Sequence, residues 1–165
     1  MPADRSGVTL RTELKPGDIG TIVRMHGVIY ATEYGFDHTF EAYVAGPLGE
    51  CVCAASPRDR IWIAERDNQI VGCIAIVAAL PQVAQLRWFL VDPAARSFGL
   101  GSLLLAEAVS FSEEKDYDSI FLWTVSALTT AARLYQSAGF KKVEEKPGRC
   151  WGVNVVEEKY EMQLK

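Results

Sequence analysis

A glycine-containing turn between a strand pattern and a helix pattern is the feature that most constrains how this chain can fold. The turn reads Arg96-Ser-Phe-Gly-Leu-Gly101, with the apolar run Val83–Val91 before it and an amphipathic helical pattern over 100–115 after it. The first N–H groups of a helix have no partner within it, the helix dipole adds positive charge there, and glycine has no Cβ to keep a ligand away. The turn therefore predicts a cradle for a phosphate-bearing ligand at the start of this helix.

Hydrophobic periodicity and turn residues predict the other elements. Apolar runs and alternation predict strands at 8–14, 61–65, 69–79, 83–91, 119–125, 140–143 and 155–164. Helical spacing predicts helices at 18–34, from 37 onward with an interruption at Gly46-Pro47, at 100–115 and at 129–137, with Asp18 and Asp37 as N-caps and Gly35 and Gly139 at the ends. This order predicts one α/β domain over 1–165, with a mixed, mostly antiparallel sheet of about seven strands flanked by about four helices. The segment 61–91 is expected to form an antiparallel meander, and 83–125 a parallel strand–helix–strand crossover.

The glycine turn does not match the common nucleotide-binding motifs. A dinucleotide fingerprint requires a third glycine where this chain has Leu104, and an acidic residue after the next strand, where it has Thr124-Val125-Ser126. A phosphate loop of nucleoside triphosphatases requires a lysine after Gly101, where Ser102 stands. Taken alone, the turn is equally compatible with a purely structural role.

Composition excludes several classes of function. The formal net charge of −4 argues against a nucleic-acid binder, although Arg87, Arg96 and Arg133 could serve a small anion. No apolar run is long enough to span a membrane, and Met1–Ser6 carries no secretory pattern, so a cytoplasmic protein is expected. The pair Cys51-Val-Cys53 is too closely spaced for a zinc site, so we expect no metal.

A second motif gives the glycine turn a more specific meaning. It reads Leu134-Tyr135-x-x-x-Gly139-Phe140 and follows in the order expected for one more strand and helix. Together the two motifs resemble those of the GNAT superfamily of acyl-CoA-dependent N-acetyltransferases, over roughly 61–165. The N-terminal segments Arg24-Met25-His26-Gly27 and Glu33-Tyr34-Gly35-Phe36 are similar to the acetyltransferase domain fused behind MarR-type regulators. The resemblance implies a GNAT-like fold, with the sheet splayed between its fourth and fifth strands.

The same resemblance implies a site for coenzyme A. Backbone N–H groups of 98–102 would cradle the pyrophosphate, Arg96 would add charge at the rim, and backbone groups of one strand would pair with the pantetheine arm. The residues implied in cofactor binding are Leu90, Val91, Arg96, Ser97, Phe98, Gly99, Leu100, Gly101, Ser102 and Ala131. The family often has asparagine where this chain has Leu128, so Thr129 or Thr130 is expected to supply that polar contact.

Tyr135 is the implied catalytic residue, because a tyrosine hydroxyl can protonate the thiolate that leaves when a thioester is attacked. The general base stays open among Glu33, His38, Glu41, Glu65 and a water chain, since the strand 83–91 carries no Asp or Glu. His26 is interpreted as a histidine at the edge of the core.

The function implied is transfer of the acetyl group of acetyl-CoA to an amine, by direct attack in a ternary complex. The acceptor is a small molecule, a lysine or a protein N-terminus, and the net negative charge slightly favours a cationic one. The alternatives are a non-catalytic CoA-binding regulatory module and a partner-interaction domain that binds no CoA. An acyl group longer than acetyl, and a monomer or a homodimer, also stay open.

Overall fold

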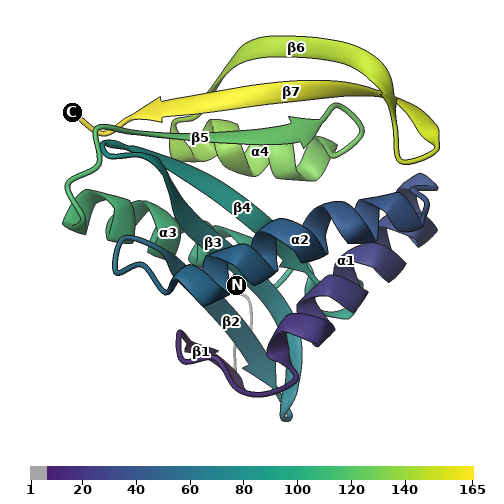
Figure 1. Ribbon diagram of the computed structural model, residues 1–165, viewed down its shortest axis with the longest axis horizontal. Coiled ribbons are helices and arrows are strands. Elements are labelled where there is room, and N and C mark those ends of the chain that lie inside the picture. The colour runs from purple at the N-terminus through teal and green to yellow at the C-terminus, as the bar shows by residue number, and fades with distance from the viewer. Residues whose placement is uncertain (1–6) are drawn as a thin grey trace.

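A single sheet with helices on both faces forms the protein (Figure 1). The computed structural model describes residues 7–165. The expectation that Met1–Ser6 carries no secretory signal concerns residues outside that range. The strands of this range are β1 (Val8–Arg11), β2 (Arg60–Arg66), β3 (Gln69–Leu80), β4 (Val83–Val91), β5 (Ser119–Val125), β6 (Lys141–Cys150) and β7 (Val153–Gln163). Its helices are α1 (Asp18–Tyr34), α2 (His38–Ala54), α3 (Leu100–Glu114) and α4 (Thr129–Ala138), with a 3-10 turn over Pro93–Ala95.

The sheet has the strand order β1-β2-β3-β4-β5-β7-β6, and every neighbouring pair except β4–β5 is antiparallel. Helices α1 and α2 cover one face around Ile22, Phe40 and Leu48, and α3 and α4 cover the other around Leu104 and Tyr135. The predicted mixed sheet, the meander β2–β3–β4 and the parallel pair β4–β5 are confirmed.

The sheet opens where β4 and β5 should continue side by side. These strands pair only through Val83–Gln85 of β4, opposite 119–121 of β5. Beyond this point neither strand pairs with the other, so the two frame a wedge, as the resemblance implied. The wedge exposes backbone groups of β4 that a ligand can reach.

A bulge in β4 sets the direction of the side chains beside this wedge. Trp88 has φ 48°, and the pairing with β3 shifts at this position. The extra residue breaks the alternation of side chains, so Arg87 and Trp88 both face α1 and α2, with the Arg87 guanidinium 4.8 Å from the Trp88 ring. The bulge thus places the Trp88 ring beside the Arg87 guanidinium, which already faces the helices by the alternation that begins at Gln85.

Three details of the predicted elements are wrong. Asp18 does not cap α1; Gly17 holds that position and Asp18 is the first helical residue. Helix α2 continues through Pro47, because Val44 and Leu48 are buried on either side of it and hold both halves against the sheet. The first predicted strand ends early, at Arg11.

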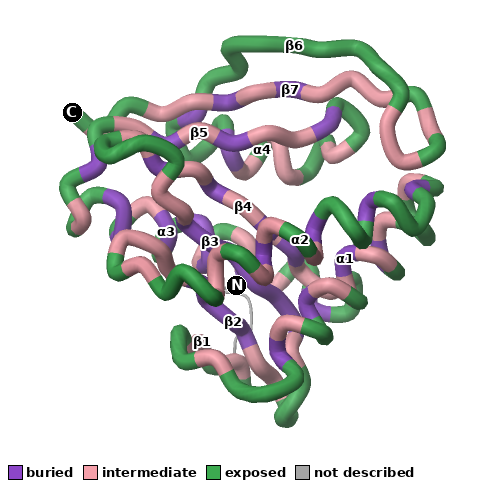
Figure 2. The backbone as a smooth tube through the Cα atoms, in the orientation of Figure 1, coloured by how far each residue is buried: buried purple, intermediate pink, exposed green. Residues whose placement is uncertain are grey.

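The last two strands are also longer than predicted and form a hairpin that turns at Trp151-Gly152. Its tip reaches the loop between α1 and α2, where the Asp37 N–H donates to the Trp151 carbonyl at 2.9 Å. Phe36 and Trp151 pack together there, with tilted rings whose centroids are 5.0 Å apart. Strand β6 is exposed along nearly its whole length (Figure 2), so its polar residues gave no apolar pattern to predict it from.

Replacing Asp18 with Asn should destabilise the protein by about 2 kcal/mol at pH 7, because Asp18 fixes the start of α1. Arg11 donates two hydrogen bonds to its carboxylate, at 2.7 and 2.8 Å, and a third to Glu65 at 2.8 Å. The hydrogen bond from Arg11 lowers the pKa of Asp18 below its ordinary value of 3.8. Its contribution is therefore complete above that value and is lost as pH falls toward the pKa of the folded state. Thermal unfolding at pH 7 and pH 3 should show that the difference in stability between wild type and D18N is smaller at pH 3. An equal difference at both pH values would contradict this role of the Asp18 carboxylate.

Candidate active site

A groove of about 530 Å³ follows the wedge between β4 and the start of α4. The residues predicted to bind the cofactor line it, except Phe98: these are Leu90, Val91, Arg96, Ser97, Gly99, Leu100, Gly101, Ser102 and Ala131. Phe98 lies 5.6 Å from the Arg66 guanidinium instead. Thr129 and Thr130 also line the groove, where they can supply the polar contact that Leu128 lacks.

The N-terminus of α3 forms one end of the groove. Ser97 and Gly99 both have φ 72°, a left-handed conformation that closes the turn, and no side chain caps the helix. Its first N–H groups are therefore left for a ligand. A Cβ on Gly101 would lie 3.0 Å from Leu134 Cδ1 and 3.6 Å from Phe89 Cζ, so a side chain at this position would crowd Leu134. This start of α3 is where the predicted anion cradle would lie.

Arg96 lies at the rim of the groove but already has a partner. Its guanidinium donates to both carboxylate oxygens of Glu33 on α1, at 2.5 and 3.1 Å, and to the Val91 carbonyl at 3.1 Å. The hydrogen bond to Glu33 raises the pKa of Arg96. This ion pair joins α1 to the glycine turn and places one of the candidate bases at the mouth of the groove.

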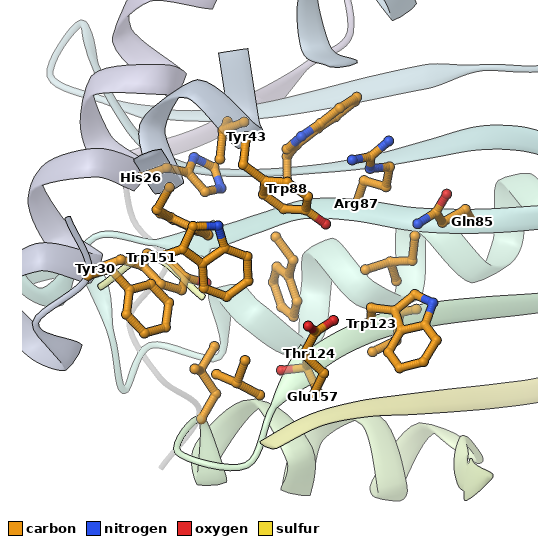
Figure 3. Close-up of a pocket in the computed structure, with 18 of the residues that line it drawn as sticks. His26, Tyr30, Tyr43, Gln85, Arg87, Trp88, Trp123, Thr124, Trp151 and Glu157 are labelled. Carbon is orange, nitrogen blue, oxygen red and sulfur yellow. The ribbon is translucent and has the colours of Figure 1, made fainter. Parts of the chain in front are cut away.

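A second hollow, which we call the inner cavity, lies between α1, α2, β4, β5 and β7 and has a volume of about 110 Å³ (Figure 3). Aromatic residues make up much of its wall: Tyr30, Phe36, Phe40, Tyr43, Trp88, Phe89, Trp123, Tyr135 and Trp151. Polar side chains also line it: His26, Gln85, Arg87, Thr124 and Glu157. Tyr30, Phe89 and Leu128 line both the groove and the inner cavity, so the two hollows adjoin.

Tyr135 lies close to the point where the hollows meet. It lines the inner cavity, while Ala131 and Leu134 of the same helix line the groove. Its ring is 6.0 Å from that of Phe89 and 5.9 Å from that of Phe140. Burial raises the pKa of Tyr135, so the hydroxyl is protonated at neutral pH and can donate a proton.

The side chains considered as bases lie outside the inner cavity. Glu33 pairs with Arg96, and Glu65 pairs with Arg11 at 2.6 Å. His38 and Glu41 are exposed on α2, with the Glu41 carboxylate against Gly27. The carboxylate that does line the cavity belongs to Glu157, on β7.

Sequence reasoning missed Glu157. Its neighbour Glu158 is buried and pairs with Lys142 at 3.2 Å, so two adjacent acids have different surroundings. The pairing of Glu157 with Val125 of β5 turns it to the face covered by α1 and α2. Strand alternation could have separated the two acids, but only with the register of β5 and β7 known.

His26 is buried, as interpreted, and it also lines the inner cavity. Its Nδ1–H donates to the Ile22 carbonyl at 2.8 Å, which leaves the lone pair on Nε2. Burial lowers the pKa of His26 to about 4, so the ring is neutral at pH 7. Within residues 7–165, His26 Nε2 and Thr124 Oγ1 are buried without a hydrogen-bond partner.

The cysteines form no disulfide in the part of the chain that the structure describes. All four thiols are free, and Cys73 is buried under the bulge with its Sγ 3.2 Å from the Trp88 carbonyl. No cluster of His, Cys, Asp and Glu in the described part of the chain could hold a metal ion. None of its helices combines the length and apolar character needed to cross a bilayer.

Comparison with known proteins gives concordant matches. The model of the acetyltransferase (GNAT) family matches residues 27–140. An uncharacterized N-acetyltransferase of Schizosaccharomyces pombe is 34% identical over 118 residues, which are 70% of this chain and 72% of that protein. N-acetylaspartate synthetase of Danio rerio is 29% identical over 106 residues, 64% of this chain but only 34% of the relative. A GNAT family acetyltransferase from Elizabethkingia anophelis, solved with acetyl-CoA bound, superposes with a TM-score of 0.66 at 16% identity, covering 97% of this chain and all of that one.

Proposed function

The chain belongs to the GNAT acetyltransferase family, and from this premise we propose that it transfers the acetyl group of acetyl-CoA to an amine. The observation that carries the proposal is the meeting of two hollows: a groove with an anion cradle at one end, and an inner cavity lined by Tyr135. A cofactor lying in the groove would bring its thioester to the acceptor in the inner cavity. The acetyl-CoA bound to the Elizabethkingia relative and the acetylated amino acid for which the synthetase is named support both substrates.

The cofactor would be held mainly by backbone groups. Its pyrophosphate would accept hydrogen bonds from the N–H groups of 98–102, with Arg96 at the rim. The pantetheine amides would pair with Leu90 and Val91, which lie beyond the part of β4 that pairs with β5. Ala131 would contact the other side of the arm, from α4.

The reaction we propose is direct attack in a ternary complex. Glu157 first accepts a proton from the acceptor's ammonium, and the free amine attacks the thioester carbonyl carbon. As the C–N bond forms and the C–S bond breaks, the electron pair goes to sulfur, which takes a proton from Tyr135. The second nitrogen proton, released as the amide forms, restores the Tyr135 hydroxyl. One proton leaves through Glu157 to solvent, so the charges balance.

The state of the cysteines supports direct attack over an acetyl-enzyme. Burial raises the pKa of Cys73 to about 12, and partial burial together with Glu157 raises that of Cys150. Both thiols are therefore protonated at neutral pH and are poor nucleophiles. Double-reciprocal plots of initial rate against acetyl-CoA concentration, at several fixed acceptor concentrations, should intersect. Parallel lines together with a trapped acetyl-enzyme would exclude direct attack.

Two measurements on the purified protein test the function. Isothermal calorimetry measures the binding of acetyl-CoA, and radiolabelled acetyl-CoA measures acetyl transfer to a panel of small-molecule amines and lysine peptides. Tight binding without transfer to any amine would favour the non-catalytic CoA-binding module. Absence of CoA binding would favour the partner-interaction domain. A parallel series of acyl-CoA thioesters establishes whether acetyl is preferred.

Replacing Gly101 with Val should weaken acetyl-CoA binding at least about tenfold. The new side chain would enter space already filled by Leu134 and Phe89, next to the first N–H groups of α3. Gly20→Val is a matched control, because Gly20 lies in α1 and, apart from its chain neighbours and the backbone of its own helix, no atom lies within 4 Å of the position of its Cβ. Calorimetry on both variants checks this; equal affinities would place the pyrophosphate elsewhere.

A further inference from the structure

The inner cavity contains two opposite charges without ion-pair partners. Arg87 on β4 and Glu157 on β7 both line it. Neither takes part in any ion pair of residues 7–165. The Arg87 guanidinium lies 4.8 Å from the centre of the Trp88 ring, and the Glu157 carboxylate accepts a weak hydrogen bond from Cys150 Sγ at 3.5 Å. Arg87 and Glu157 are both half-buried, and each lines the cavity without a counter-charge, so the pattern indicates a ligand that supplies both counter-charges.

The two charges come from different walls. In Figure 3, Arg87 and Gln85 extend from β4, whereas Glu157 lies beside Thr124 on the other side of the hollow. A single ammonium or a single carboxylate would neutralise one wall and leave the other. A molecule with both groups can satisfy both walls at once.

The surroundings of Glu157 fit the ammonium end. Its carboxylate accepts a weak hydrogen bond from Cys150 and can accept more from an ammonium, which has three N–H groups to donate. Arg87 fits the carboxylate end, because a guanidinium can donate two parallel hydrogen bonds to a carboxylate. The aromatic residues that line the cavity, Tyr43 and Trp151 among them, suit an apolar body between the two charged ends.

We infer that the acceptor is a zwitterionic amine of the amino-acid class, with its ammonium at Glu157 and its carboxylate at Arg87. The inference rests on the proposed acetyl transfer and makes Arg87 the residue that determines the acceptor class. A polyamine or a lysine side chain would carry positive charge without an anion for Arg87. The charges inside the cavity therefore point away from the cationic acceptors that the net charge of the chain suggested.

The test compares each amino acid with its own decarboxylated amine. Alanine with ethylamine, leucine with isoamylamine and phenylalanine with phenethylamine differ only in the carboxylate. With labelled acetyl-CoA, at least one amino acid should exceed its amine in kcat/KM by 10-fold or more, as one charge-assisted contact allows. Arg87→Gln should abolish that preference and leave the affinity for acetyl-CoA unchanged. The control Arg24→Gln removes the same charge from an exposed position on α1 and should keep the preference.

Each outcome is decisive. If the amines react as well as the amino acids, or if the preference survives in Arg87→Gln, the inference is wrong while the proposed acetyl transfer stands. If no compound is acetylated although acetyl-CoA binds, the proposed function fails and the inference fails with it. If thermal unfolding shows that Arg87→Gln does not fold, Arg87→Met replaces it, because methionine retains an apolar stem beside Trp88. The comparison of amino acids with their amines on the wild-type protein does not depend on either variant.

Discussion

Replacing Tyr135 with Phe should lower kcat about 100-fold and leave KM for acetyl-CoA nearly unchanged. The change removes one oxygen and keeps the ring that packs against Phe89, Phe140 and Tyr160. Burial raises the pKa of Tyr135, so the wild-type residue holds its proton until the sulfur leaves. Without that donor, the thiolate departs unprotonated. Initial rates at varied acetyl-CoA and saturating acceptor measure both constants.

Tyr160→Phe is the matched control for this prediction. Its ring is 5.8 Å from that of Tyr135 and is equally buried, but it is not among the residues that line the groove or the inner cavity. It should keep kcat within a few-fold of wild type. Full activity in Tyr135→Phe would remove Tyr135 from the mechanism and leave protonation of the thiolate to water.

The parts of the fold that short-range patterns determine were predictable from the sequence. The turn between β2 and β3 is an example: Asp67 and Asn68 have φ 52° and 61°, as a two-residue hairpin turn requires, and both residue types tolerate that conformation. Pro47 misled the prediction, because its local effect on a helix is outweighed by burial of its neighbours. The polar strand β6 was largely missed, because it is held by pairing with β7 rather than by a buried face.

The two hollows of the candidate site also differ in how far the sequence could predict them. The groove could be predicted because most of its residues are consecutive, so a short motif contains them. The inner cavity could not, because separate elements contribute single residues to it. Arg87 shows the difference: in sequence it lies near the glycine turn, yet it follows Gln85 on the face of β4 covered by α1 and α2 and so lines the inner cavity, away from the groove. Arg133, which the sequence associated with the same turn, is exposed on α4.

Replacing Glu157 with Gln should lower kcat/KM for the acceptor about 100-fold at pH 7. The amide keeps the size of the side chain but cannot accept the proton of the attacking ammonium. As pH rises toward the pKa of a free amine, roughly 8 to 10, a growing fraction of the acceptor arrives already deprotonated and needs no base. The deficit of the variant should therefore shrink with rising pH. Profiles of kcat/KM against pH from 6 to 10, for wild type and variant, measure this change.

Glu161→Gln is the control for that profile, because Glu161 lies on the same strand and pairs with β5 on the same face, but outside the inner cavity. It should follow the wild-type profile at all pH values. A deficit in Glu157→Gln that is constant from pH 6 to 10 would contradict a proton-accepting role, since a residue that only binds the acceptor or shapes the cavity is needed equally whether or not the amine is protonated. The pH dependence of the deficit thus separates a base from a residue that merely orients the acceptor.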